Sequence, residues 1–298
     1  MPTIETRSVF SGIPVVEAMR RQVISLPCSA DISQGIRMMI RYKVNAVLLT
    51  DNKIPCGVVS KTDLMGALYA GLPAETLLSD VMGGQPIACF PDDTVENALE
   101  IMDAAGVHRL YVTGANREEV IGIVAYSGIL GLLYRYCRAC ERGTAKKRAK
   151  ISEIDPSVRL TVREVMTQEV WACHDHDQLF TVIDTLSTHQ LGAVLIQDES
   201  HYPVGVISKT DLVVAYHHGV SAETQALEIM NTPVHSVPPD MLLSEAIQKM
   251  LLQDIQRLFV HHEVSGQNSI TGVLALSDAA RFRSGSCRAC SAGRMLSL

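Results

Sequence analysis

The sequence has little of what a membrane-spanning, exported or catalytic protein needs. Its most apolar stretch, Ile121 to Tyr134, is interrupted by Ser127, Gly128 and Gly131 and is shorter than the roughly 20 residues of a spanning helix. The first residues are polar and lack a basic stretch before an apolar run, so no signal peptide is indicated. Nucleophile elbows, Walker-type phosphate loops and His-Glu metal signatures are missing as well. We therefore expect a cytoplasmic protein with no membrane partner and no catalytic activity.

Positive charge is also scarce. The 298 residues are 47% hydrophobic and carry a formal net charge of −6, which gives no overall attraction for nucleic acid or an anionic membrane. The most basic segment, 135–150, is flanked by tyrosines only at its start, so it indicates a solvated linker rather than a nucleic-acid site. The composition predicts a globular chain of two or three domains.

The chain is an internal duplication. The octapeptide GVVSKTDL at 57–64 returns as GVISKTDL at 205–212, which is 148 residues later. Each half divides again, because the segment that ends at 122–125 resembles the one that ends at 57–60. Four units of about 55 residues result.

The second unit shows the local pattern. Residues 86–90 form a short β-type run, and apolar positions over 95–105 keep helical spacing after a capping turn. The runs 109–112 and 120–124 are typical of strands around a polar turn, and 127–134 of a closing helix. The predicted order is β-α-β-β-α. One such unit is too small to bury its apolar sheet face alone, so we expect units 1 and 2, and units 3 and 4, to pair.

These four units resemble CBS (cystathionine-beta-synthase) domains, and each pair resembles a Bateman module. The resemblance implies an α/β fold with two modules in a pseudo-twofold disc. It also implies a regulatory protein that binds an adenosine-containing ligand (AMP, ADP, ATP or S-adenosylmethionine) between paired repeats and acts allosterically on an unknown protein. The expected segments are repeat 1 at 14–70, repeat 2 at 78–135, a linker at 136–160, repeat 3 at 161–217, repeat 4 at 226–283 and a tail at 284–298.

The resemblance places the ligand at the turn from the third strand to the second helix. There the family carries Ser or Thr followed three residues later by Asp, and the Asp binds the ribose hydroxyls. A carboxylate accepts two hydrogen bonds from a diol, and a helix start favours an anion. A lysine in the same turn neutralises phosphate. The residues of the two matching turns are Ser60, Lys61, Thr62 and Asp63 in repeat 1 and Ser208, Lys209, Thr210 and Asp211 in repeat 3.

The resemblance places the adenine against the start of the second strand, where small residues permit close approach. Trp171 is the single tryptophan and either stacks on adenine or fills the core. The predicted wall residues are Ile24, Val44, Asn45, Ala46, Trp171, Leu191, Gly192 and Ala193.

The even-numbered repeats depart from the pattern. Repeat 2 has Ala125 and Gly128 where Ser and Asp are expected, so its ribose anchor is missing. Repeat 4 has Ala275 but keeps Asp278, which leaves a weaker site. We therefore expect an empty or altered site in repeat 2.

A basic pair opens the second strand in the even-numbered repeats. His108 and Arg109 in repeat 2 resemble the pair that contacts phosphate across the cleft in related modules, and Arg257 is the counterpart in repeat 4. These side chains either contact the phosphate of a ligand in the odd-numbered repeats or close an ion pair at the rim.

Two CxxC motifs follow the last helix of each module, at Cys137 and Cys140 and at Cys287 and Cys290. Four thiolates together suit tetrahedral zinc or an iron–sulfur cluster, and two thiols could instead form a redox dithiol. Neighbouring arginines would lower the thiol pKa values, which favours both the metal site and the redox dithiol. The pairs meet only if the axis between modules passes near both or if two chains form a homodimer. A redox or metal-linked protein is therefore the alternative function, and cysteines without chemistry are the third possibility.

The other four cysteines lie at or beside strands: Cys28, Cys56, Cys89 and Cys173. A reducing compartment argues against disulfides. We expect these four to be buried thiols.

Overall fold

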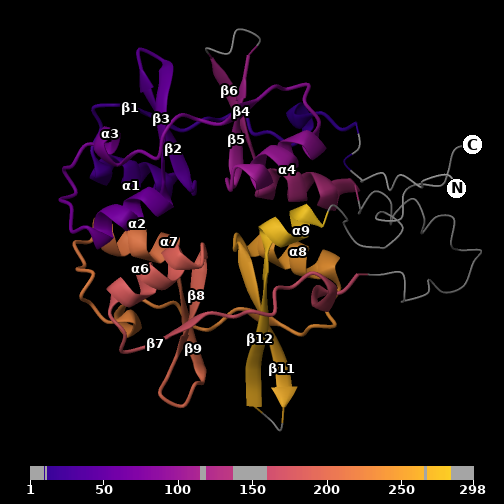
Figure 1. Cartoon of the computed structure of the whole chain (residues 1–298). Coiled ribbons are helices and arrows are strands. Elements are labelled where there is room, and N and C mark those ends of the chain that lie inside the picture. The colour runs from indigo at the N-terminus through magenta and orange to yellow at the C-terminus, as the bar shows by residue number, and fades with distance from the viewer. Residues whose placement is uncertain (1–9, 11, 115–118, 137–159, 265–266, 283–298) are drawn as a thin grey trace, which may run out of the picture.

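The computed structural model describes residues 10, 12–114, 119–136, 160–264 and 267–282. Within these ranges, each repeat holds one sheet of three strands (Figure 1). The first strand of each sheet runs parallel to the second, and the second pairs antiparallel with the third. The predicted α/β fold of four β-α-β-β-α repeats in two modules is confirmed.

The elements follow one another in the same order in each repeat. Repeat 1 comprises η1 (Val15–Glu17), β1 (Ser25–Pro27), α1 (Ile32–Arg41), β2 (Ala46–Asp51), β3 (Ile54–Ser60) and α2 (Lys61–Tyr69). Repeat 2 comprises α3 (Leu78–Val81), β4 (Ala88–Cys89), α4 (Val95–Ala104), β5 (Arg109–Thr113), β6 (Val120–Ala125) and a helix at 126–136. Repeat 3 comprises η3 (Val162–Glu164), β7 (Ala172–His174), α6 (Leu179–Thr188), β8 (Ala193–Gln197), β9 (Pro203–Ser208) and α7 (Lys209–His217). Repeat 4 comprises η4 (Ala226–Glu228), β10 (Ser236–Val237), α8 (Leu243–Gln253), β11 (Arg257–Val264), β12 (Gln267–Ala275) and α9 (Leu276–Arg281).

The helix between the first and second strands of each repeat (α1, α4, α6 and α8) ends in the same way. A residue with positive φ follows it: Lys43 (52°), Gly106 (63°), Gln190 (52°) and Asp254 (56°). This left-handed conformation stops the helix and turns the chain into the next strand. The four second strands therefore start at equivalent points, which brings the predicted site residues to equivalent places.

In each odd-numbered repeat, the segment before the first strand packs on the following repeat. Pro14 and Arg20 form bridges with Thr94 and Ile123 of repeat 2. The segment before β7 does the same with repeat 4, through Thr161 and Thr167. These exchanged segments join two repeats into one module.

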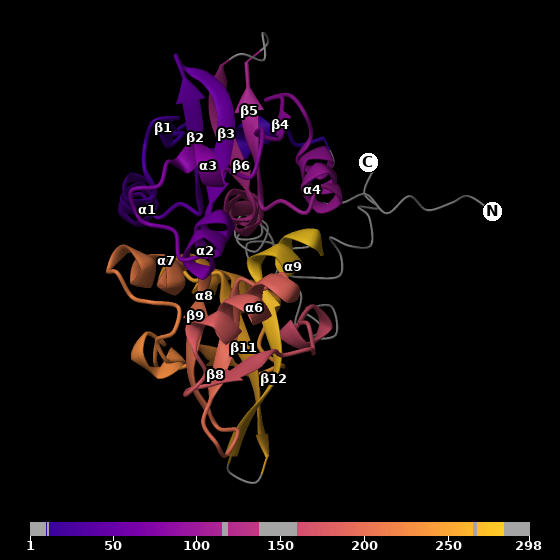
Figure 2. The same cartoon turned by 60° about the vertical axis from the view of Figure 1, so that its left-hand side comes forward.

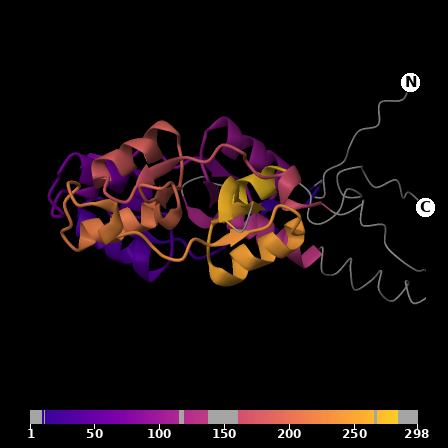
Figure 3. The same cartoon turned by 90° about the horizontal axis from the view of Figure 1, so that it is seen from below.

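Two hydrophobic cores lie between the modules. One contains side chains of repeats 1 and 3, and the other contains side chains of repeats 2 and 4. The helices meet at the centre, with α2 against α6 and α7, while the sheets lie toward the outside (Figures 1 and 2). Seen from below, the two modules form a flattened body (Figure 3). The expected pseudo-twofold axis therefore passes through the centre, where the four repeats meet.

One pair of cysteines differs from the prediction. Cys89 and Cys173 are buried and free as expected, but Cys28 and Cys56 are half-buried and form a disulfide. The expectation of thiols was wrong for this pair. Both residues lie beside β2, where Pro27 and Pro55 each pair with Thr50, and their separation of 28 residues along the chain gave no sign of this proximity.

Candidate functional site

The two Ser-Lys-Thr-Asp turns start helices α2 and α7. In the first, the backbone N and Oγ of Ser60 both donate to Asp63 Oδ2 at 2.7 Å. In the second, the backbone N and Oγ of Ser208 donate to Asp211 Oδ2 at 2.7 and 2.6 Å. Each motif thus caps its own helix. Among the described residues, neither Oδ1 atom accepts a hydrogen bond, so one carboxylate oxygen of each turn is available to a ligand.

The lysines of the two turns reach across the module interface. Lys61 Nζ donates to Thr210 Oγ1 at 2.8 Å, and Lys209 Nζ donates to Thr62 Oγ1 at 2.9 Å. The sequence placed each lysine beside its own aspartate. In the structure, the charge of Asp211 acts on Lys61 instead, and that of the first turn's aspartate acts on Lys209.

All the side chains that are predicted to contact phosphate lie beside these two turns. Lys61 is only 8% exposed, and its pKa falls to about 8 because it is buried and because Arg109 lies near it. Burial and Arg257 likewise lower the pKa of Lys209. Although part of the His108 ring is exposed, partial burial and then the charges of the two arginines lower its pKa to about 4. The cations at this junction therefore repel one another, and an anion would relieve that repulsion.

Burial also lowers the pKa of both arginines. The Arg257 guanidinium lies against Gly192, in the space that any side chain at that position would need. The Gly192 carbonyl also accepts from Lys209 N at 3.1 Å, as the Asn45 carbonyl accepts from Lys61 N at 3.0 Å. Gly192 is predicted to permit the close approach of adenine. In this structure the Arg257 guanidinium makes that close approach instead.

The other predicted wall residues lie around the same strand starts. Trp171 is half-buried, packs against the core of repeats 1 and 3, and stacks on His189 with 3.3 Å between ring centroids and 19° between planes. The remaining wall residues are buried or half-buried: Ile24, Val44, Ala46, Leu191 and Ala193.

The altered site of repeat 2 has no room for the missing aspartate. A Cβ on Gly128 would lie 2.5 Å from the carbonyl oxygen of Ala18. That oxygen belongs to the exchanged segment before β1, so backbone fills the position that Asp63 has in repeat 1.

We predict that Gly128→Ala destabilises the protein by about 1–3 kcal/mol, because the backbone of Ala18 would have to shift. The matched control is Gly131→Ala in the same helix, where a Cβ would meet no atom within 4 Å. That change should be neutral or stabilising by less than about 1 kcal/mol. Urea unfolding of both variants measures the difference, and equal midpoints would contradict the prediction.

Repeat 4 keeps part of the pattern. Asp278 Oδ2 accepts from Ala275 N at 2.9 Å, and Asp278 raises the pKa of Arg257, although burial lowers it more. Leu276, which is buried, stands in the position of Lys61. Repeat 4 therefore offers a carboxylate but no lysine of its own.

Sequence reasoning missed two residues beside this cluster. Tyr126 is buried and lies edge-on to His108, with 5.7 Å between ring centroids. The Arg281 guanidinium lies 5.9 Å from the Tyr126 ring centroid and bridges the modules through an ion pair of 2.9 Å with Asp103. Tyr126 could have been found from its position in the repeat, because it follows Ala125 as Lys61 follows Ser60. Nothing in the sequence indicated Arg281.

The predicted metal ligands Cys137, Cys140, Cys287 and Cys290 lie outside the described residues. Within the described ranges, no group of three or more His, Cys, Asp or Glu side chains could hold a metal ion. Helices in those ranges are also too short or too polar to cross a bilayer. The four-cysteine site therefore stays a prediction.

The sequence matches the CBS domain family at 13–70, 78–135, 162–218 and 226–285. These four matches cover most of the chain. The protein therefore belongs to the CBS domain family.

Its relatives include an uncharacterised protein, MJ1225, from Methanocaldococcus jannaschii. That protein is 22% identical over 201 residues, which are 67% of this chain and 69% of the relative. Its crystal structure, presented as that of a proposed archaeal homologue of g-AMPK, matches 91% of this chain and 99% of its own with a TM-score of 0.75 and 15% identity. A conserved protein of Pyrococcus horikoshii matches 91% of this chain and 100% of its own with a TM-score of 0.56 and 16% identity. Both structures share the four-repeat fold.

Proposed function

We propose that this protein is a regulatory sensor that binds a phosphorylated adenosine, such as AMP, ADP or ATP, where the four repeats meet. The observation that carries the proposal is the cation cluster of Lys61, Lys209, Arg109 and Arg257 beside two carboxylates that each keep one free oxygen. Phosphate has the charge and the acceptor oxygens that this cluster lacks. S-adenosylmethionine has no phosphate and carries a positive sulfonium, so it fits the cluster less well.

Each ligand would use both modules. The free Oδ1 of Asp63 or Asp211 accepts from the ribose diol, and the phosphate lies at the helix start. The lysine of the opposite module then faces that phosphate, because it already lies beside the opposite turn. The likeness to a proposed homologue of g-AMPK supports an AMP-type ligand.

Binding would alter the contact between the modules. A phosphate competes with Thr62 and Thr210 for the two lysines, so the ligand and the threonines stabilise different arrangements of the same helices. Only such a difference in affinity between two states lets a ligand regulate a partner. The regulated partner is a protein that senses this arrangement.

Calorimetric titration with AMP, ADP, ATP and S-adenosylmethionine tests the proposal. We expect the phosphorylated ligands to bind at micromolar to low-millimolar concentrations, and Asp63→Ala with Asp211→Ala to abolish binding. Each of these changes also removes a helix cap, so the matched control is Asp31→Ala, which removes the cap of α1 and should keep ligand affinity. Absence of binding to the unmodified protein would overturn the proposal, as would equal loss in the control.

A further inference from the structure

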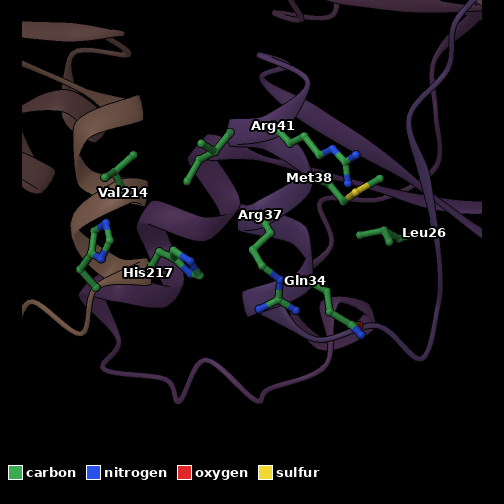
Figure 4. A pocket seen from close by; sticks show the side chains of 9 residues that line it. Leu26, Gln34, Arg37, Met38, Arg41, Val214 and His217 are labelled. Atoms are coloured by element: carbon green, nitrogen blue, oxygen red, sulfur yellow. The ribbon is translucent and has the colours of Figure 1, made fainter.

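A groove on the surface runs between α1 of repeat 1 and α7 of repeat 3, away from the ligand turns. It is open to solvent and has a volume of about 690 Å³. Leu26, Met38 and Val214 give it apolar walls, and His217 follows Val214 on α7. Figure 4 shows Val214 and His217 on α7 facing the side of α1 that carries Arg37. The groove therefore lies at the boundary between the two modules, on one face of the protein.

The rim of the groove is cationic, because Arg37 and Arg41 line it. Arg37 Nη1 donates to Ser33 Oγ at 2.6 Å, and the Arg41 guanidinium lies 5.5 Å from the centroid of the Tyr42 ring. In the part of the chain that the structure describes, neither arginine forms an ion pair, and no Asp or Glu lines the groove. This positive rim stands out on a chain of net charge −6.

The duplicated fold contains a counterpart that serves as a comparison. At the equivalent place between α6 and α2, Phe180 replaces Ser33 and Tyr69 replaces His217. These two rings pack edge-on with 5.2 Å between centroids, and so they occupy the space that is open on the other side. Asp184 also replaces Arg37. The fold alone therefore does not require an open, basic groove.

We propose that this groove is the docking site for an acidic amphipathic segment of a partner protein. Apolar side chains of such a segment would cover Leu26, Met38 and Val214, and its carboxylates would pair with Arg37 and Arg41. An amphipathic helix laid into a groove between two helices is a common mode of peptide recognition. Charge complementarity selects an acidic segment, because the rim is positive and the walls are apolar.

Helix α7 connects this groove to the ligand turns. It starts at Lys209 in the second turn and ends at His217 in the groove, eight residues later, which is about 12 Å along the helix axis. The helix is tied to module 1 near both ends, through Lys209 and Thr62 at 2.9 Å and through the Tyr216 hydroxyl and the Leu72 carbonyl at 2.5 Å. A ligand that draws Lys209 from Thr62 thus acts on the helix that forms one wall of the groove. This coupling step rests on the proposed function, whereas docking itself does not.

Fluorescence anisotropy with the full-length protein tests the docking site. The probe is a labelled helical peptide of about 18 residues with leucines along one face and glutamates along the other. We expect binding at micromolar concentrations and a loss of at least about tenfold for Arg37→Glu with Arg41→Glu. A charge-matched control, Lys53→Glu with Arg163→Glu at exposed positions outside the groove, should keep the affinity within about twofold.

A second variant separates the groove from simple charge attraction. Ser33→Phe with His217→Tyr copies the filled counterpart while it keeps both arginines, so it should also lose at least about tenfold in peptide affinity. The proposal is overturned if the wild-type protein does not bind the peptide, or if either groove variant binds it unchanged. Displacement of the peptide by low-millimolar inorganic phosphate would overturn it in favour of a small-anion site. A protein dimer that Arg37→Glu with Arg41→Glu dissociates would overturn it in favour of a second copy.

Calorimetry with AMP on the same variants distinguishes the two proposals. Peptide binding without nucleotide binding would leave the docking site in place and overturn the sensor. Nucleotide binding without peptide binding would leave the sensor in place and overturn the docking site. If both bind, we expect saturating AMP to change the peptide affinity by at least about fivefold, and an unchanged affinity would overturn the coupling.

Discussion

Lys61→Met is expected to raise the free energy of unfolding by about 2 kcal/mol at pH 7 and to weaken AMP binding by about 10- to 100-fold. The pKa of Lys61 is lowered from 10.5 to about 8, which means that its charge destabilises the folded state by about 3 kcal/mol at neutral pH. Loss of the hydrogen bond to Thr210 offsets about 1 kcal/mol of this gain. The same charge would bind phosphate, so stability and affinity should change in opposite directions.

Urea unfolding and calorimetry measure the two effects. Because the folded pKa lies below the unfolded one, the penalty is complete below pH 8 and disappears as pH rises toward 10.5. The gain in stability of Lys61→Met should therefore shrink over that range. Lys53→Met removes an exposed lysine and should change stability by less than about 0.5 kcal/mol. A Lys61→Met protein that is less stable than the unmodified protein would contradict the prediction, because it would mean that the charge of Lys61 stabilises the folded state.

AMP affinity is expected to fall about tenfold between pH 7 and pH 9, because Lys61 must be charged to bind phosphate and its pKa in the free protein is about 8. The phosphate itself is already dianionic above pH 7. Protons should be taken up on binding near pH 8, which calorimetry in buffers of different ionisation enthalpy detects. Lys61→Arg keeps its charge over this range and should flatten the profile. An equal dissociation constant at pH 7 and pH 9 for the unmodified protein would contradict the prediction.

The fold could be predicted from the sequence because the repeats agree with one another. Each unit has the same strand and helix pattern, and the capping turn at Ser60 and Asp63 recurs at Ser208 and Asp211. The family match and the four equivalent sheets confirm that reading. The assignment of individual site residues stays a prediction.

Contacts between the modules could not be predicted in the same way. A duplication shows which positions are equivalent, but it does not show which of them face one another. The sequence therefore predicts Lys61 beside Asp63, whereas its amine lies beside Thr210. The backbone of Ala18 occupies the place of a ribose anchor in repeat 2, and this contact could not be predicted for the same reason, since the exchanged segment is distant from Gly128 along the chain.

The reciprocal bonds of Lys61 with Thr210 and of Lys209 with Thr62 describe an interface that two identical modules could form with each other. Two separate chains would meet only at the concentration of the protein, whereas two modules on one chain meet at an effective concentration that reaches about the millimolar range. Covalent linkage thus removes most of the concentration dependence of assembly. It also allows the two halves to differ in sequence, so one face can hold Tyr69 and Phe180 while the other keeps its arginines. In a dimer of identical chains, any substitution would appear on both faces at once.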